Sequence, residues 1–151
     1  MKTLRLLLTL SIFSLAFFTI DAQDIRTIVI EGYDNLQYSK EEIVAEPGER
    51  IKVVMKTISD QPKQTMAHNW VLIKKDANPR EFALTASRHR DNGFITPGSE
   101  DKIIARTEMV GGGNQDAVTF TVPEKPGSYT YLCTFPGHYI AGMKGTLKVK
   151  E

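Results

Sequence analysis

Apolar and polar residues alternate with a period of two in several short segments of this chain, a pattern that suits strands and not helices. Ile51, Val53 and Met55 would face one side of a strand, while the lysines among them would face the other. Segments 118–122 and 129–133 alternate in the same way, and turn-forming residues separate the segments. Many short strands joined by turns predict an all-β fold, either a sandwich or a barrel.

One segment departs from this pattern. Asn78, Pro79 and Glu81 supply a helix N-cap, a proline at the first helical position and a glutamate three residues after the cap. Apolar residues at helical spacing follow between positions 82 and 86. We therefore expect a short helix to about Arg90, forming a helical flap inserted into the β-domain and not a second domain.

The first 22 residues have the layout of a secretory signal peptide: basic residues, an apolar run from 6 to 18 and a short polar end. A membrane anchor is the alternative, but the apolar run is shorter than the ~20 residues that a spanning helix needs. We expect cleavage after about Ala22, export to the periplasm or another outside compartment, and no stable membrane insertion. Residues 23–151 would then form a single domain.

The charges of the chain nearly cancel, with 19 Lys and Arg against 18 Asp and Glu. Removing residues 1–22 takes away two basic residues and one acidic residue, so that 17 of each remain. No excess of positive charge therefore favours nucleic acid as a partner. Cys133 is the only cysteine, so an exported chain cannot form an internal disulfide, and this thiol is left over, paired between chains or committed to chemistry.

Cys133, His138 and Met143 lie five residues apart and offer a thiolate, an imidazole and a thioether. Soft and borderline donors of this kind favour copper, and two histidines, one cysteine and a distant axial methionine form the blue-copper arrangement. The second histidine must be His68, in an apolar run typical of a buried strand, or His89, which lies between two arginines. His68 is the better candidate, because the arginines would oppose a cation.

Other interpretations remain open for these residues. A single Cys, His or Met is most often structural, and zinc competes for such donors, although zinc generally takes four strong ligands. A site with all strong positions filled by protein leaves no place for a substrate, which indicates an electron carrier and not an enzyme. A copper-delivery protein of the cell envelope is the alternative. A copper oxidase or reductase would need a second copper, and three histidines cannot build it.

The motifs resemble those of a known family. The sequences Cys-Thr-Phe-Pro-Gly-His at 133–138, Met-Lys-Gly-Thr-Leu at 143–147 and His-Asn-Trp-Val-Leu at 68–72 are similar to azurin. The four residues between His138 and Met143 are more similar to auracyanin. Both are cupredoxins, so the resemblance implies a Greek-key β-sandwich or barrel that holds one copper per chain.

The resemblance also implies a role for each ligand. His68, Cys133 and His138 would form a trigonal plane around the copper, and Met143 would make the weak axial bond. In azurins a glycine carbonyl before the first histidine approaches the other axial side. Ala67 occupies that place here, and its backbone carbonyl is the corresponding candidate contact.

Three neighbours of the ligands match residues that support the site in the family. Asn69 and Thr134 correspond to the residues whose hydrogen bonds hold the ligand loops together, and the Phe135 backbone N–H is expected to bond to the Cys133 sulfur. Such hydrogen bonds tune a metal centre. The disulfide of azurins cannot form here, because the chain has one cysteine.

The far edge of the His138 ring is expected at the surface, inside an apolar ring on which redox partners dock. Redox interfaces are small, and an apolar ring allows brief, close encounters. Ordinary loop packing is the alternative for the aromatic members. We expect a monomeric one-electron carrier between redox proteins, a cytochrome or a membrane electron-transfer complex. The expected docking residues are Phe135, Pro136, Gly137, Tyr139 and Met66.

Overall fold

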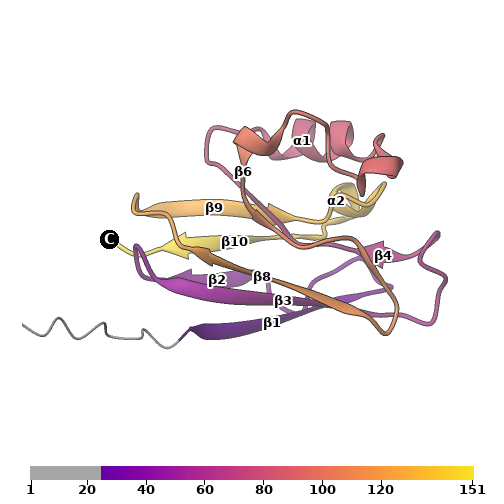
Figure 1. Ribbon diagram of the computed structural model, residues 1–151, viewed down its shortest axis with the longest axis horizontal. Coiled ribbons are helices and arrows are strands. Elements are labelled where there is room, and N and C mark those ends of the chain that lie inside the picture. Colours follow the sequence, from indigo (N-terminus) through magenta and orange to yellow (C-terminus); the bar gives the residue numbers. More distant parts are fainter. Residues whose placement is uncertain (1–24) are drawn as a thin grey trace, which may run out of the picture.

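The structure, a computed structural model, describes residues 25–151 and consists mainly of strands (Figure 1). The expected signal peptide, residues 1–22, lies outside the described residues. The strands are β1 (Arg26–Tyr33), β2 (Glu42–Ala45), β3 (Arg50–Ile58), β4 (Ala67–His68), β5 (Val71–Ile73), β6 (Ile103–Arg106), β7 (Val110–Gly111), β8 (Gln115–Thr121), β9 (Gly127–Leu132) and β10 (Lys144–Val149). The helices are α1 (Pro79–Ala86), η1 (Arg90–Asn92), η2 (Glu100–Lys102) and α2 (His138–Ala141).

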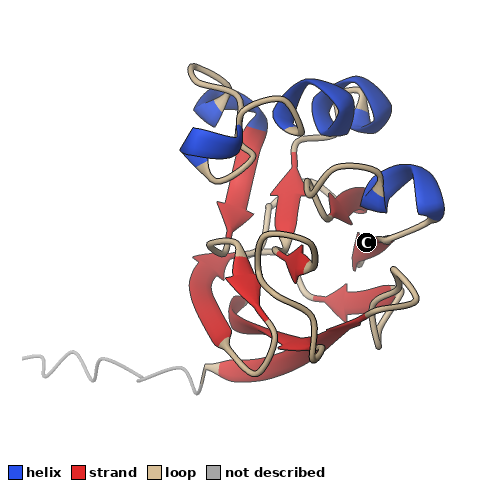
Figure 2. Ribbon diagram, turned by 90° about the vertical axis from the view of Figure 1, so that its right-hand side faces the viewer, coloured by secondary structure: helices blue, strands red, loops and turns tan. Residues whose placement is uncertain are grey.

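The strands form a sandwich and not a closed barrel. One sheet has the order β1-β3-β8, the second has the order β2-β10-β9-β5-β6, and β4 and β7 form a short third pair. Two of the pairings, β1 with β3 and β2 with β10, are parallel, while the others are antiparallel. The helices lie outside the sheets (Figure 2). The predicted all-β class is confirmed, whereas β6 and β7 were not predicted.

The core lies between the two sheets, where the alternating residues meet. Ile51, Val53 and Met55 of β3 are all 0 % exposed, as their alternation predicted. Trp70 and Tyr131 are equally buried and pack with ring centroids 5.5 Å apart. Trp70 is two residues after His68, and Tyr131 is two residues before Cys133, so this pair joins the core to the segments that carry the expected ligands.

Helix α1 begins as predicted but ends earlier. The Asn78 side chain accepts a hydrogen bond from the Glu81 N–H at 3.1 Å, which caps the helix. The apolar residues of α1 pack over β5 and the end of β9. The helix ends at Ala86 and not near Arg90, because the next turn offers only polar residues and nothing further to bury.

Four chain segments end or begin at one end of the sandwich, where Figure 1 shows β4 and α2. Strand β9 ends one residue before Cys133, β4 ends on His68, α2 starts at His138 and β10 starts one residue after Met143. The fold therefore gathers all four predicted metal ligands at the same end. Within residues 25–151, no helix is long and apolar enough to cross a membrane.

Candidate metal centre

A tight loop connects Cys133 to Met143, and backbone hydrogen bonds hold it closed. The Cys133 N–H donates to the Met143 carbonyl at 3.1 Å, and the Met143 N–H donates to the His138 carbonyl at 2.9 Å. Gly137 has a φ of 83°, a left-handed conformation that glycine adopts without strain. These bonds bring three residues spaced five apart in sequence to one point.

His68 reaches the same point from a different strand pair. It ends β4, which pairs with β7 through His68 and Val110. His68 and Cys133 are 0 % exposed and His138 is 3 % exposed. His89, the alternative fourth ligand, precedes η1 and is not part of this cluster.

The donor atoms of the three side chains lie close enough to bind one ion. The Nδ1 atoms of His68 and His138 are 3.2 Å apart, and the Cys133 Sγ lies 3.5 Å from the His138 Nδ1. All three donor atoms lie within 4.8 Å of one another. Because metal–nitrogen bonds are about 2.0–2.1 Å long, two nitrogens at this separation can share a metal. The residues thus fit a copper ion in both chemistry and spacing.

Burial keeps both imidazoles neutral at physiological pH. It lowers the pKa of His68 to about 4, and the nearby His138 adds to this shift while Asp34 opposes it. Burial likewise lowers the pKa of His138 to about 4. A neutral imidazole is the form that binds a metal, so no proton has to leave these rings before an ion enters.

Burial has the opposite consequence for Cys133, because it keeps the thiol protonated and a metal binds the thiolate. Burial raises its pKa to about 12, and backbone hydrogen bonds from Asn69 and Phe135 partly offset that shift. A buried thiolate therefore needs a cation beside it, since burial penalises the charged form. The Phe135 bond was expected from the family resemblance, whereas the Asn69 backbone bond was not.

Met143, the expected axial ligand, is also 0 % exposed. Its methyl group packs against Gly32 of β1, where an added Cβ would lie 2.8 Å from both the Met143 Cε and the His68 Cδ2. Gly32 thus leaves the space in which these two side chains meet. This role was not predicted, although a glycine within a β-strand often marks such a close approach.

Asn69 ties the two ligand segments together. Its side-chain N–H donates to the Thr134 hydroxyl at 2.8 Å, and its side-chain oxygen accepts from the Thr134 backbone N–H at 2.9 Å. The Tyr38 hydroxyl also donates to the Asn69 carbonyl at 2.5 Å. Asn69, which follows His68, is therefore bonded to Thr134, which follows Cys133 and lies 65 positions further along the chain. Ala67, the candidate carbonyl contact, is buried beside His68 in β4.

The surface around His138 differs from the expectation in one respect. The ring was expected to present an edge at the surface, but His138 is only 3 % exposed, because the Phe135 ring packs against it at a centroid distance of 4.7 Å. The expected docking residues do reach the surface. Phe135, Tyr139 and Met66 are half-buried, and Pro136 and Gly137 are exposed.

Comparisons with known proteins agree with this geometry. The family described as copper binding proteins, plastocyanin/azurin family, matches residues 26–150. An azurin from Achromobacter denitrificans is 38 % identical over 128 residues, which cover 81 % of this chain and 83 % of that protein. Dithionite-reduced auracyanin from Roseiflexus castenholzii superposes with a TM-score of 0.69 at 36 % identity, covering 83 % of this chain and 97 % of the other. An azurin from Methylomonas sp. strain J superposes with a TM-score of 0.72 at 34 % identity, covering 83 % and 98 %.

Proposed function

Because the chain belongs to the plastocyanin/azurin family of copper-binding proteins, we propose that it is an exported one-electron carrier with a single blue copper site. Copper supplies a reversible one-electron couple between Cu(I) and Cu(II). The proposal rests above all on one observation, the three buried donor atoms of His68, Cys133 and His138 within 4.8 Å of one another.

Each side chain has a defined part in this function. His68, His138 and Cys133 would hold the ion in a plane, and Met143 would bind weakly along the axis, the arrangement typical of electron-transfer copper. The Ala67 carbonyl is the candidate for the opposite axial position. Hydrogen bonds to the Cys133 sulfur from Asn69 and Phe135 stabilise the thiolate, and such bonds tune the reduction potential.

Burial and rigidity of the ligands favour transfer of electrons over chemistry on a substrate. The donors come from strand ends and from a loop closed by backbone hydrogen bonds, so the ligand geometry changes little when the charge of the ion changes. A substrate would need an open coordination position. Buried donors also favour retention of the ion, so a carrier of electrons fits the site better than a copper-delivery protein.

The partners follow from the surface around His138. Phe135, two residues after Cys133, and Tyr139, one residue after His138, offer a small apolar face, and such a face suits the brief contacts of redox proteins. We propose that the partners are redox proteins of the same exported compartment, such as a cytochrome or a membrane electron-transfer complex. The monomer is the proposed functional unit, and cleavage after about Ala22 would release it.

Visible absorption tests the copper site directly. Adding Cu(II) to the metal-free protein should produce an intense thiolate-to-copper band, dithionite should bleach it, and an oxidant should restore it. Replacement of the thiol by Cys133→Ser should abolish the band, while the His89→Gln control should keep it. A chain that stays colourless with copper and oxidant, or a coloured C133S variant, would rule out this assignment.

A chelator distinguishes the two copper functions. An electron carrier should lose its copper slowly to a strong chelator, because its donors are buried. A delivery protein should release the ion quickly to an acceptor. The decay of the visible band after chelator addition gives the rate.

A further inference from the structure

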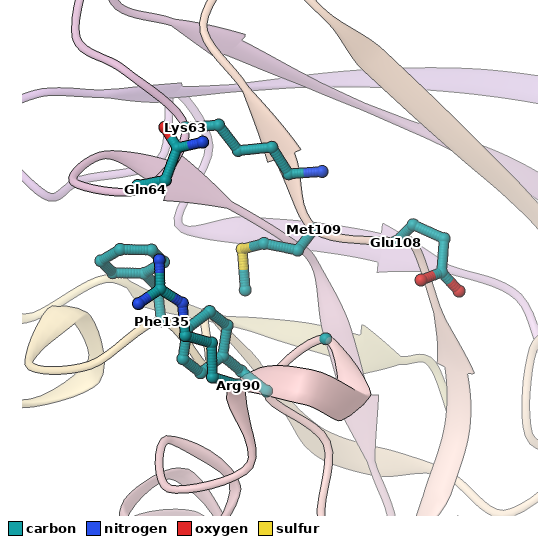
Figure 3. Close-up of a pocket in the computed structure, with 8 residues that line it drawn as sticks. Lys63, Gln64, Arg90, Glu108, Met109 and Phe135 are labelled. Carbon is teal, nitrogen blue, oxygen red and sulfur yellow. The ribbon is translucent and has the colours of Figure 1, made fainter.

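A hollow of about 490 Å³ opens beside the metal centre and shares Phe135 with its surroundings. Its floor is apolar and is formed by Phe94, Met109 and Phe135. The Met109 side chain points into it (Figure 3). The Phe94 and Phe135 ring centroids are 5.1 Å apart. Phe135 in turn packs on His138, so a group seated in the hollow is separated from a copper ligand by one aromatic ring.

The rim of the hollow is basic. Lys63 and Arg90 line it and are both exposed, and neither belongs to an ion pair among the described residues. Glu108 is the one acidic residue of the lining, but its carboxylate is already paired with the Arg106 guanidinium at 2.6 Å. Among the described residues, the two cations of the rim therefore have no ion-pair partner of their own, although the chain as a whole carries a net charge of only +1.

The backbone beside the hollow is held in an unusual conformation. Phe94 has a φ of 59°, a left-handed value that is rare for a bulky residue and that tends to occur at functional sites. Its N–H donates to the His89 carbonyl at 2.9 Å, which fixes the turn. This conformation supports the Phe94 ring that packs against Phe135.

Resting on the proposed function, we propose that this hollow is where the redox partner docks, and that the partner inserts an acidic side chain flanked by apolar surface. The carboxylate lies between Lys63 and Arg90, and the apolar part covers Met109 and Phe135. Opposite charges at the rim steer the encounter and set its orientation, while the apolar floor excludes water. With copper bound, the haem Fe(III) of the docked partner would accept one electron from the Cu(I) site, which would leave Fe(II) and Cu(II). The docking face thus extends beyond the residues expected from sequence.

Cross-linking tests the contact without relying on electron transfer. The probes are an acidic c-type cytochrome and a basic c-type cytochrome, each mixed with the metal-free protein and with the copper-loaded protein. A carbodiimide joins a lysine amine to a carboxylate only when the two touch. Cross-links from Lys63 to the acidic cytochrome should dominate over those from Lys52 and Lys148, which are exposed residues of β3 and β10. Cross-links spread evenly over all three lysines would overturn the inference.

Rates test the role of the charges. The Lys63→Gln/Arg90→Gln variant should oxidise about tenfold more slowly than the unmodified protein with the acidic cytochrome at low salt, and unchanged or faster with the basic one. The difference in rate between this variant and the unmodified protein should disappear as the ionic strength is raised from roughly 10 mM to roughly 150 mM, because the Debye length falls from about 30 Å to about 8 Å. The Lys52→Gln/Lys148→Gln control removes the same charge elsewhere and should change neither rate more than about twofold. Equal behaviour of the two double variants would overturn the inference.

The two proposals fail in different ways. A protein that shows no visible band or no reversible reduction would count against the blue-copper function. A coloured, reducible protein whose K63Q/R90Q variant exchanges electrons like the control would count only against the basic hollow. The visible spectrum and the reduction potential of each variant confirm beforehand that the metal centre is intact.

Discussion

At the scale of single residues, the metal centre joins groups that burial would otherwise keep neutral. His68 and His138 each have a pKa near 4, and Cys133 has a pKa near 12. In these neutral forms the three groups have no net charge to attract one another, although the two Nδ1 atoms are 3.2 Å apart and the Cys133 Sγ lies 3.5 Å from the His138 Nδ1. A cation changes this balance, because it replaces the thiol proton and binds both imidazoles.

These pKa values predict how the metal-free protein responds to acid. The histidine pKa is 6.5 in the unfolded chain and about 4 in the fold, so between these values the unfolded state binds more protons. The free energy of unfolding should therefore fall as the pH is lowered from 6.5 toward 4, and it should be fully retained above that range. Urea midpoints at several pH values between 5 and 7.5 measure the effect.

His68→Gln serves as the control for that experiment. It removes one of the two bases, so its urea midpoint should depend less steeply on pH than that of the unmodified chain. A midpoint that stays constant across the window in the unmodified protein would show that the two histidines are not held neutral by the fold.

Met143 gives a second prediction at the residue scale. Met143→Leu conserves volume in a fully buried position, so the fold should survive. Without the weak axial thioether the copper should stay bound and coloured, and the reduction potential should rise, because the axial ligand tunes it. A redox titration followed in the visible band measures the shift. Complete loss of copper would contradict the weak axial role.

At the scale of elements, the site depends on two segments that the sandwich places side by side. Strand β4 brings His68, and the loop after β9 brings Cys133 and His138. The hydrogen bonds between Asn69 and Thr134 join these segments, and Tyr38, between β1 and β2, holds Asn69 from a third segment. These contacts between distant parts of the sequence limit the motion of the loop that carries Cys133 and His138.

Asn69→Ala should weaken this connection. It leaves the buried Thr134 N–H without its partner, at a cost of about 1–3 kcal/mol in the free energy of unfolding. The visible band should also broaden, since the thiolate loop is held less firmly. Urea unfolding and the absorption spectrum are the measurements. Thr134→Val removes only the hydroxyl partner and should cost less, so equal losses in the two variants would argue against the backbone bond as the main contribution.

At the scale of the whole molecule, the donors exist as a set only when the β4–β7 pair and the sheet that contains β9 and β10 are both in place. Copper that binds the folded chain more tightly than the unfolded chain must then stabilise the fold. The expected gain is about 4 kcal/mol when free copper exceeds its dissociation constant by about 1,000-fold.

Thermal unfolding with and without copper tests this linkage. The melting temperature of the unmodified protein should rise when copper is added and fall again with a chelator. Cys133→Ser should lose most of this rise. If the melting temperature of the unmodified chain did not change with saturating copper, the ion would not be bound by the folded site.

The local sequence determined what each segment could become. Alternation of apolar residues determined strands such as β3, β8 and β9. The N-cap at Asn78 determined where α1 begins, and the spacing of Cys133, His138 and Met143 indicated copper, since each pattern acts over a few neighbours. Only the tertiary structure decided that Gly32 makes room for the His68 and Met143 side chains, and that Lys63 and Arg90 share a hollow with Phe135. Those outcomes depend on contacts between residues tens of positions apart, which no local pattern records.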